Sequence, residues 1–203
     1  MRFTIFLLVF FITSIAHAAS PAQNWIGPYR PCRNHDDLLT HRHMDLGVRF
    51  STTNIVLAQQ FEKAMNFWSE ILDMTWHEDD SENCSMQLVD GAPELFASGS
   101  GFECAAARAQ LPDRLGFQGW IAFNPAISST SEQMYRDAVH EIGHLLGLQH
   151  NPSSLSVMFF NDFGQESSLD DSDLRALAAL HKLRPGVLDG TAHVTEIVSL
   201  QTE

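Results

Sequence analysis

The stretch from His140 to His150 constrains this chain most, because it sets three histidines at fixed separations around two glycines. On a helix, His140 and His144 project from one face about one turn apart, so both imidazoles can bind the same metal ion. Gly147 lacks a Cβ and can leave the helix through a left-handed turn. That turn would bring back His150 as a third ligand. The pattern therefore predicts a metal site made by one helix and the turn after it.

The kind of ligand and the neighbouring carboxylate indicate the chemistry of this site. Three neutral imidazoles leave one position of a zinc ion open, as in catalytic zinc sites, whereas structural sites are closed by four protein ligands. Glu141 follows the first histidine and would lie beside the metal, where an attacking water needs a base. The alternative is a histidine-rich amphipathic helix without metal. The second glycine and the third histidine fit the longer catalytic pattern and favour zinc.

Size, composition and charge limit the remaining possibilities. The chain has 203 residues, of which 44% are hydrophobic, so it can bury the core of one globular domain. Its formal net charge is -13. Such an acidic surface repels phosphate backbones and anionic lipids, so we expect neither a nucleic-acid nor a membrane partner.

The first 18 residues have the pattern of a secretory signal peptide. Arg2 supplies a positive charge, residues 3–15 are almost wholly apolar, and Ala16-His17-Ala18 is a small-x-small cleavage site. The apolar run is too short for a membrane span, which needs ~20 residues. We therefore expect residues 1–18 to be removed and the protein to be extracellular. The alternative is an uncleaved anchor.

Apolar spacing predicts three helices within residues 44–185. The first is capped by Thr52 or Thr53 and runs to about Leu72, with an apolar residue every three or four positions. The second carries the histidines and begins with a Thr130/Gln133 capping box. The third is capped by Asp170 and ends before Pro185. Strands are expected at residues 46–51, 74–76, 86–89, 102–107 and 120–123. This order of elements indicates an α+β domain built on a sheet.

The flanking segments and the cysteines are less regular. Residues 19–43 read as an irregular N-terminal arm or short propeptide, and residues 186–203 as a C-terminal tail. A secreted protein can form disulfides, and three cysteines allow at most one intramolecular pair. Cys84 and Cys104 both lie within the domain and are the preferred pair, which would leave Cys32 free. The histidines outside the motif, His181 among them, are expected at the surface.

The motif resembles that of the metzincin zinc peptidases, and most closely that of the matrixins. The residues that carry the resemblance are His140-Glu141-x-Gly143-His144-x-Leu146-Gly147-Leu148-x-His150, then Met158, then a C-terminal helix at residues 169–177. The similarity covers roughly residues 46–183 and is strongest from Tyr135 to Met158. It implies a twisted, mostly parallel five-stranded sheet with three helices and an active-site cleft.

The resemblance also implies roles for single residues and an activity. His140, His144 and His150 would bind one catalytic Zn²⁺, Glu141 would be the general base, and Met158 would underlie the site as the Met-turn. The residues that would contact substrate are Phe159 and Phe160, which wall the pocket beyond the cleaved bond, and Ala105 and Ala106 in an edge strand at residues 102–107. The implied function is a secreted, monomeric zinc metalloendopeptidase acting on proteins or peptides. The alternative is a secreted zinc-binding interaction module with weak or no activity.

Some features of the family are altered in this chain. The propeptides of this family usually carry a Pro-Arg-Cys-Gly switch whose thiolate binds the zinc. In this chain, Pro31-Cys32-Arg33 resembles that switch only weakly. Cys32, Asp36 and Asp37 are therefore candidate latency ligands, and the alternative is that Cys32 forms a disulfide with Cys84 or Cys104 and fastens the arm. Many matrixins also bind a second zinc and calcium. Residues 86–125 contain no histidine, which argues against the usual second zinc, while a Ca²⁺ site stays open.

Overall fold

The computed structural model describes residues 43–81, 84–90, 93–102, 104–109, 119–160 and 168–188. The predicted signal peptide, the N-terminal arm up to residue 42 and the tail beyond Leu188 lie outside the described residues. The elements in chain order are β1 (Met44–Ser51), α1 (Ile55–Ile71), β2 (Met74–Glu78), β3 (Met86–Asp90), the 3₁₀ helix η2 (Pro93–Phe96), β4 (Ala107–Ala109), β5 (Gly119–Phe123), α2 (Ser131–Leu145) and α3 (Asp171–Leu180).

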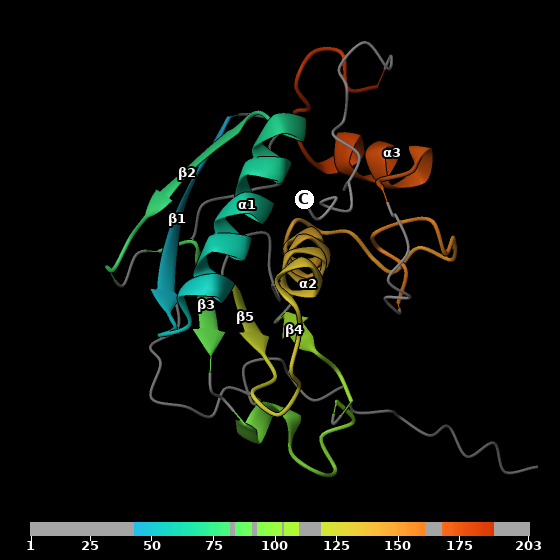
Figure 1. The fold of residues 1–203 in the computed structure, drawn as a ribbon. Helices are drawn as coiled ribbons and strands as arrows, with labels where there is room; N and C mark the ends of the chain where they lie inside the picture. Colours follow the sequence, from blue (N-terminus) through green and yellow to red (C-terminus); the bar gives the residue numbers. More distant parts are fainter. Residues whose placement is uncertain are drawn as a thin grey trace, which may run out of the picture.

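The sheet has five strands in the order β2-β1-β3-β5-β4 (Figure 1). All neighbouring strands are parallel except β4, which pairs antiparallel with β5 and places Arg108 opposite Ala122. The predicted mostly parallel five-stranded sheet with three helices is therefore confirmed. Parallel neighbours need long crossovers, and α1 supplies the one between β1 and β2. At the opposite end of the sheet, β4 is the edge strand nearest to α2 in Figure 1.

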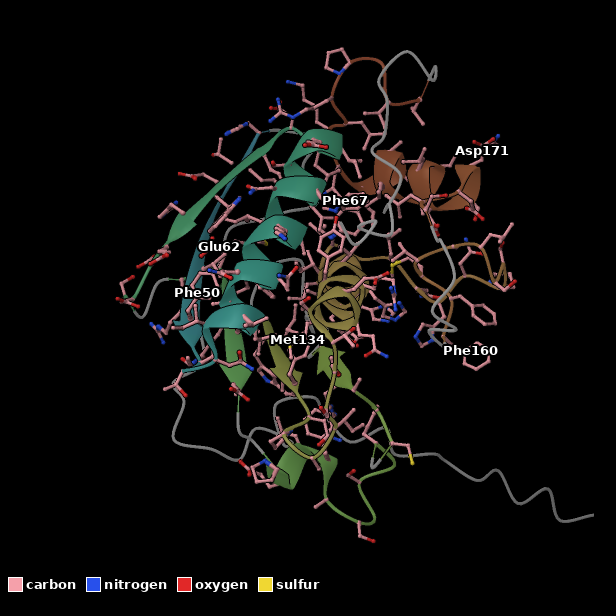
Figure 2. The ribbon with its side chains drawn as sticks, viewed as in Figure 1. Phe50, Glu62, Phe67, Met134, Phe160 and Asp171 are labelled. Atoms are coloured by element: carbon pink, nitrogen blue, oxygen red, sulfur yellow. The ribbon has the colours of Figure 1, made fainter. Side chains whose placement is uncertain are left out.

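The main core lies between the sheet and the two long helices, which pack against each other (Figures 1 and 2). Trp68 of α1 is fully buried there, and its indole N–H donates to the carbonyl oxygen of Val139 in α2 across 3.2 Å. A second, smaller cluster lies on the other face of the sheet. It joins strand residues to η2 and comprises Val89, Leu95, Phe96, Trp120 and Ala122. Both faces of the sheet are therefore covered at β5, which explains why every residue of this strand is buried.

Side-chain caps fix where the three helices begin. Thr130 and Gln133 form the predicted capping box of α2, and Asp170 forms the predicted cap of α3 with Asp173 as its partner. The expected start of α1 at Thr52 or Thr53 is wrong. Asn54 is its N-cap, because the Asn54 side chain accepts a hydrogen bond from the backbone N–H of Leu57 at 3.1 Å.

The predicted strand at residues 102–107 is also wrong, since β4 begins only at Ala107. The segment before it turns, with the Ala105 N–H bonded to the Phe102 carbonyl at 3.0 Å. The Phe102 ring lies 3.9 Å from the guanidinium carbon of Arg108 instead of continuing the strand. A turn closed by backbone hydrogen bonds, with Phe102 against Arg108, therefore takes the place of the expected start of the strand.

Two further expectations do not hold. Cys104 is free and exposed, whereas Cys84 is buried and disulfide-bonded, so the preferred Cys84–Cys104 pair does not form. His181 is buried rather than at the surface, and its Nε2 donates to the Leu146 carbonyl across 2.7 Å. A buried backbone acceptor at the end of α2 explains why this histidine lies inside. None of the helices in the described ranges combines the length and hydrophobicity of a membrane span.

Candidate metal centre

Helix α2 and the turn after it bring the three predicted histidines together. His140 and His144 lie on one face of α2, with ring centroids 4.6 Å apart. The chain leaves the helix at Gly147, whose φ of +95° is the predicted left-handed conformation, and His150 then lies 4.7 Å from the ring of His144. One ligand nitrogen from each histidine lies within 4.8 Å of the others. In the described residues this is the one group of three or more His, Cys, Asp or Glu side chains placed to hold a metal.

Backbone carbonyls orient two of these rings. Nδ1 of His140 lies 2.7 Å from the Val157 carbonyl, and Nδ1 of His144 lies 2.9 Å from the Leu148 carbonyl. A carbonyl only accepts, so Nδ1 carries the proton and Nε2 keeps a lone pair for a metal. Burial is the main cause that lowers the pKa of His144, with a smaller contribution from His150. Its imidazole is therefore held in the neutral form that a metal requires. This donor set fits zinc.

Met158 lies directly beneath the turn of α2 that carries the histidines. Its side chain is fully buried, and its sulfur would be 2.5 Å from a Cβ placed on Gly143. A Cβ there would also meet the ring of Trp68 at 3.2 Å. Gly143 is thus required because a residue without a Cβ lets Met158 and Trp68 pack closely against α2, and not because of its backbone angles. The role of Met158 as the Met-turn stays a prediction.

A buried polar cluster that sequence reasoning missed holds the loop from His150 to Met158 against α3. The Asn151 amide donates to Asp173 Oδ1 at 2.9 Å, and the Ser156 hydroxyl donates to Asp173 Oδ2 at 2.6 Å. Ser156 Oγ in turn accepts the backbone N–H of Met158 at 2.9 Å. Asp173 also belongs to the capping box of α3, and its spacing from Asp170 in the sequence gives no sign of this second role.

Glu141 is buried beside the histidines, and its carboxylate accepts a hydrogen bond from the backbone N–H of Ala109 in β4. Burial is the largest cause that raises the pKa of Glu141 to about 8, and the nearby charge of Asp137 adds to it. The Ala109 N–H and the charge of Arg108 act in the opposite direction. A divalent cation bound by the histidines would also lower the pKa of Glu141, because its positive charge stabilises the adjacent carboxylate.

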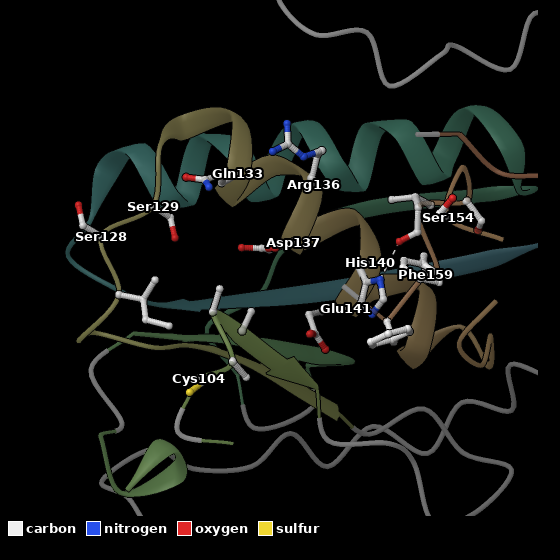
Figure 3. A pocket seen from close by; sticks show the side chains of 17 residues that line it. Cys104, Ser128, Ser129, Gln133, Arg136, Asp137, His140, Glu141, Ser154 and Phe159 are labelled. Carbon is white, nitrogen blue, oxygen red and sulfur yellow. Dashed lines mark hydrogen bonds between the residues drawn. The ribbon is translucent and has the colours of Figure 1, made fainter. Parts of the chain in front are cut away.

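A cavity of about 310 Å³ opens next to His140 and Glu141 (Figure 3). It lies between α2, the segment that leads into β4, and the loop that carries Met158. All four residues predicted to contact substrate line this cavity: Ala105, Ala106, Phe159 and Phe160. Its other walls include polar residues that sequence reasoning did not select, among them Gln133 and Asp137 of α2. The candidate latency ligands Cys32, Asp36 and Asp37 lie outside the described residues.

Arg108 is a second residue near the site that sequence reasoning missed. It lies in β4 between two residues that face α2, so its side chain extends from the other face of the sheet. There its guanidinium donates to the Leu95 carbonyl at 2.8 Å and covers the ring of Phe102. Arg108 thereby fastens η2 and the segment after it to the back of β4. Burial is the larger influence on Arg108 and lowers its pKa, while the charge of Glu141 raises it.

Comparison with known proteins agrees with this geometry. A family model of the matrixin peptidases matches residues 39–182, more than half of the chain. Matrix metalloproteinase-21 of Mus musculus is 34% identical over 143 residues, in a match that covers 64% of this chain and 24% of the relative. The protein of the same name from Homo sapiens is 34% identical over 137 residues, in a match that covers 62% of this chain and 24% of the relative. That of Cynops pyrrhogaster is 31% identical over 142 residues, and the match covers 64% of this chain and 22% of the relative.

This chain thus spans about a quarter of the length of the relatives it matches. Matrixins are zinc-dependent metallopeptidases, and the three histidines that the family requires are brought together here. The family match, the sheet topology and the histidine site all agree, and the chain belongs to the matrixin family of metzincin peptidases.

Proposed function

We propose that this protein is a secreted zinc-dependent endopeptidase that hydrolyses peptide bonds in proteins. Residues 44–185 would form the catalytic domain, with His140, His144 and His150 as the zinc ligands and Glu141 as the general base. The observation that carries the proposal is the meeting of three imidazole nitrogens beside a buried carboxylate at the mouth of a cavity. Zinc bound by three imidazoles makes water more acidic and polarises a carbonyl group.

The residues of the chain would divide the remaining work. Glu141 would take the proton of the attacking water and pass it to the departing amine. Its bond to the Ala109 N–H holds the carboxylate between α2 and β4, where it faces the cavity. The Nδ1–carbonyl bonds of His140 and His144 would keep their Nε2 atoms directed at one point. An extended substrate would lie along the edge strand β4, because main-chain pairing to an edge is a common mode of peptide recognition.

The surroundings of the site support an enzyme over a binding module. A module that only binds zinc has no need of Glu141, whose burial and raised pKa are costly to maintain. Ala105 and Ala106 would border the bound peptide, and Phe159 and Phe160 would wall the pocket beyond the cleaved bond. Secretion after loss of residues 1–18, a monomeric state and optional Ca²⁺ binding belong to the same proposal. They follow from the signal-peptide pattern and the family.

Cleavage of an unbiased peptide mixture, followed by mass spectrometry, tests this function. The zinc-loaded protein should cleave peptides, a chelator should abolish cleavage, and added zinc should restore it. Glu141→Gln should keep zinc and the fold but lose activity by at least about a hundredfold, because an amide cannot accept the proton. Glu62→Gln in α1 removes the same charge outside the cavity and should cleave normally. Chelator-resistant cleavage, or none at all, would contradict the proposal.

A further inference from the structure

Asn124 lies directly after β5, at the point where the chain leaves the sheet toward α2. The residue is buried, with 5% of its surface exposed. It is not among the residues that line the cavity, so it would not touch a substrate itself. Its hydrogen bonds reach two separate walls of that cavity.

The first wall is the segment that leads into β4, where Ala105 and Ala106 line the cavity. Nδ2 of Asn124 donates to the carbonyl oxygen of Ala105 across 3.0 Å. The backbone N–H of Asn124 donates to the carbonyl oxygen of Ala106 across 2.8 Å. The regular pairing of β4 with β5 begins only at Ala107. Asn124 therefore fastens the cavity wall at a point that the strand pairing does not reach.

The second wall is the connection between β5 and α2, of which residues 127–129 line the cavity. Oδ1 of Asn124 accepts the backbone N–H of Ala126 across 3.0 Å. The backbone carbonyl of Asn124 accepts the N–H of Ile127 across 3.2 Å. These two bonds close a turn, and the turn fixes the direction in which the lining residues leave the sheet.

The amide group of Asn124 thus holds both walls at once. A carbonyl only accepts and an N–H only donates, so this position needs a donor and an acceptor on one short side chain. Asparagine provides both, whereas an ionised aspartate provides no donor. Figure 3 shows Cys104, at the start of the first wall, and Ser128, in the second, at the end of the cavity away from His140. The separation of the walls at that end therefore depends on Asn124.

We propose that Asn124 is a positioning residue that sets the shape of this cavity and thereby selects the length of the side chain accepted directly after the cleaved bond. The inference rests on the proposed peptidase function and names what fixes its selectivity. A long side chain would extend from the catalytic end toward the end of the cavity that Asn124 holds. An alanine side chain would not reach that end. A change at Asn124 should therefore affect long side chains most.

Matched peptides with alanine, norleucine or glutamine at this position test the proposal in the full, zinc-loaded chain. For the better of the two long residues, wild-type kcat/KM should exceed that of alanine by about tenfold or more. Asn124→Asp keeps the acceptor for Ala126 but removes the donor to Ala105, so this ratio should fall by at least about threefold. The fall should appear in KM rather than kcat, because the walls bind the side chain and do not touch the reacting atoms.

A matched control distinguishes positioning from a general loss of folded protein. Asn66→Asp makes the same change in α1, where the exposed Asn66 amide accepts a hydrogen bond from Trp76, and it should leave the ratio unchanged. A variant that only folds less well would lose the same factor of activity with every peptide. An equal loss of this kind for Asn124→Asp, or a wild-type protein indifferent to side-chain length, would overturn the role of Asn124.

A binding measurement separates this proposal from the catalytic one. Zinc-loaded Glu141→Gln should bind a labelled norleucine or glutamine peptide more tightly than the alanine peptide in fluorescence anisotropy. Adding Asn124→Asp should reduce that preference. If the unmodified protein cleaved no peptide and this pattern of binding held, the peptidase would be refuted and the role of Asn124 would stand. An unchanged preference in the double variant would overturn that role.

Amide hydrogen exchange gives a test that needs no variant of Asn124. In the wild-type protein, the Ala126 N–H should exchange at least about tenfold more slowly than in an unstructured chain, because Oδ1 of Asn124 holds it. In zinc-loaded Glu141→Gln, the more tightly bound long peptide should slow this exchange further, and the alanine peptide should not. Fast exchange at Ala126, or equal protection by both peptides, would contradict the proposal.

Discussion

The amide of Asn151 donates a hydrogen bond to Oδ1 of Asp173 across 2.9 Å, and this bond joins the residue after the third histidine to the first turn of α3. The other oxygen of Asp173 accepts from Ser156, and the backbone N–H of Asn151 bonds to the Met158 carbonyl at 2.8 Å. Both His150 and Met158 are thereby positioned by one buried carboxylate. The site thus depends on a contact with α3, a helix that contributes none of the predicted zinc ligands.

Asn151→Ala should lower both stability and zinc affinity. The change leaves Oδ1 of the buried Asp173 without this donor, which costs about 1–3 kcal/mol in the free energy of unfolding. Urea unfolding and zinc titration measure the two effects. Asn66→Ala removes an exposed amide whose oxygen accepts from Trp76, and it should cost much less. If both variants were equally stable and bound zinc equally well, the cluster would have no positioning role.

Gly143→Ala should destabilise the protein because the new methyl group would collide with Met158. Overpacking of this kind costs about 1–3 kcal/mol, and here it would more than offset the better helix propensity of alanine. Thermal unfolding provides the measurement. The double variant Gly143→Ala/Met158→Ala opens space for the methyl group, so its loss of stability should be smaller than the sum of the two single losses. Simple additivity would show that the contact is not responsible.

Elemental analysis after dialysis should find about one zinc per chain, because a single three-histidine group is placed to hold a metal in the described residues. His144→Ala should reduce the zinc content to near zero. His43→Ala, which changes an exposed histidine bound to Asp73, should retain it. Two firmly bound zinc ions in the wild-type protein would reveal a second site.

Acid should release the metal and stop proteolysis. Zinc binds neutral imidazole, so protons compete for the three histidines below the ordinary histidine pKa of about 6.5. Because burial lowers the pKa of His144, this residue stays neutral to a lower pH than a free histidine, and release should be complete only well below that value. Zinc content and activity should be measured after dialysis at stepwise lower pH, then again after neutralisation with zinc. Full zinc retention at about pH 4 would contradict the histidine assignment.

Peptide mass mapping should find Cys84 joined to Cys32. Cys84 is disulfide-bonded and Cys104 is free, so Cys32 is the remaining cysteine of the chain. This bond would fasten the N-terminal arm and leave Asp36 and Asp37 as the candidate latency ligands. Removing residues 19–43 from such a latent enzyme should raise its activity. A free Cys32 thiol would instead restore the thiolate as the candidate, and Cys32→Ala should then activate the enzyme.

Local patterns were sufficient to predict the helix that carries the site and the grouping of its three histidines. These patterns act over a few residues, so their structural consequences can be predicted from residues that are neighbours in the sequence. They are the histidine spacing, Gly147, and the Thr130 and Asp170 caps. The order of elements indicated the α+β class, and the family resemblance supplied the topology that the sheet confirms.

Contacts between distant segments decided the rest. The edge strand begins later than predicted, after a turn in which Phe102 lies against Arg108. His181 is buried where it meets the carbonyl of Leu146. Asp137 lines a cavity only because the segment that leads into β4 and the Met158 loop form the other walls of that cavity. A sequence pattern reports which face of a helix a residue occupies. Tertiary structure alone decides which buried partner that face meets, because burial makes each polar group depend on the few atoms packed against it.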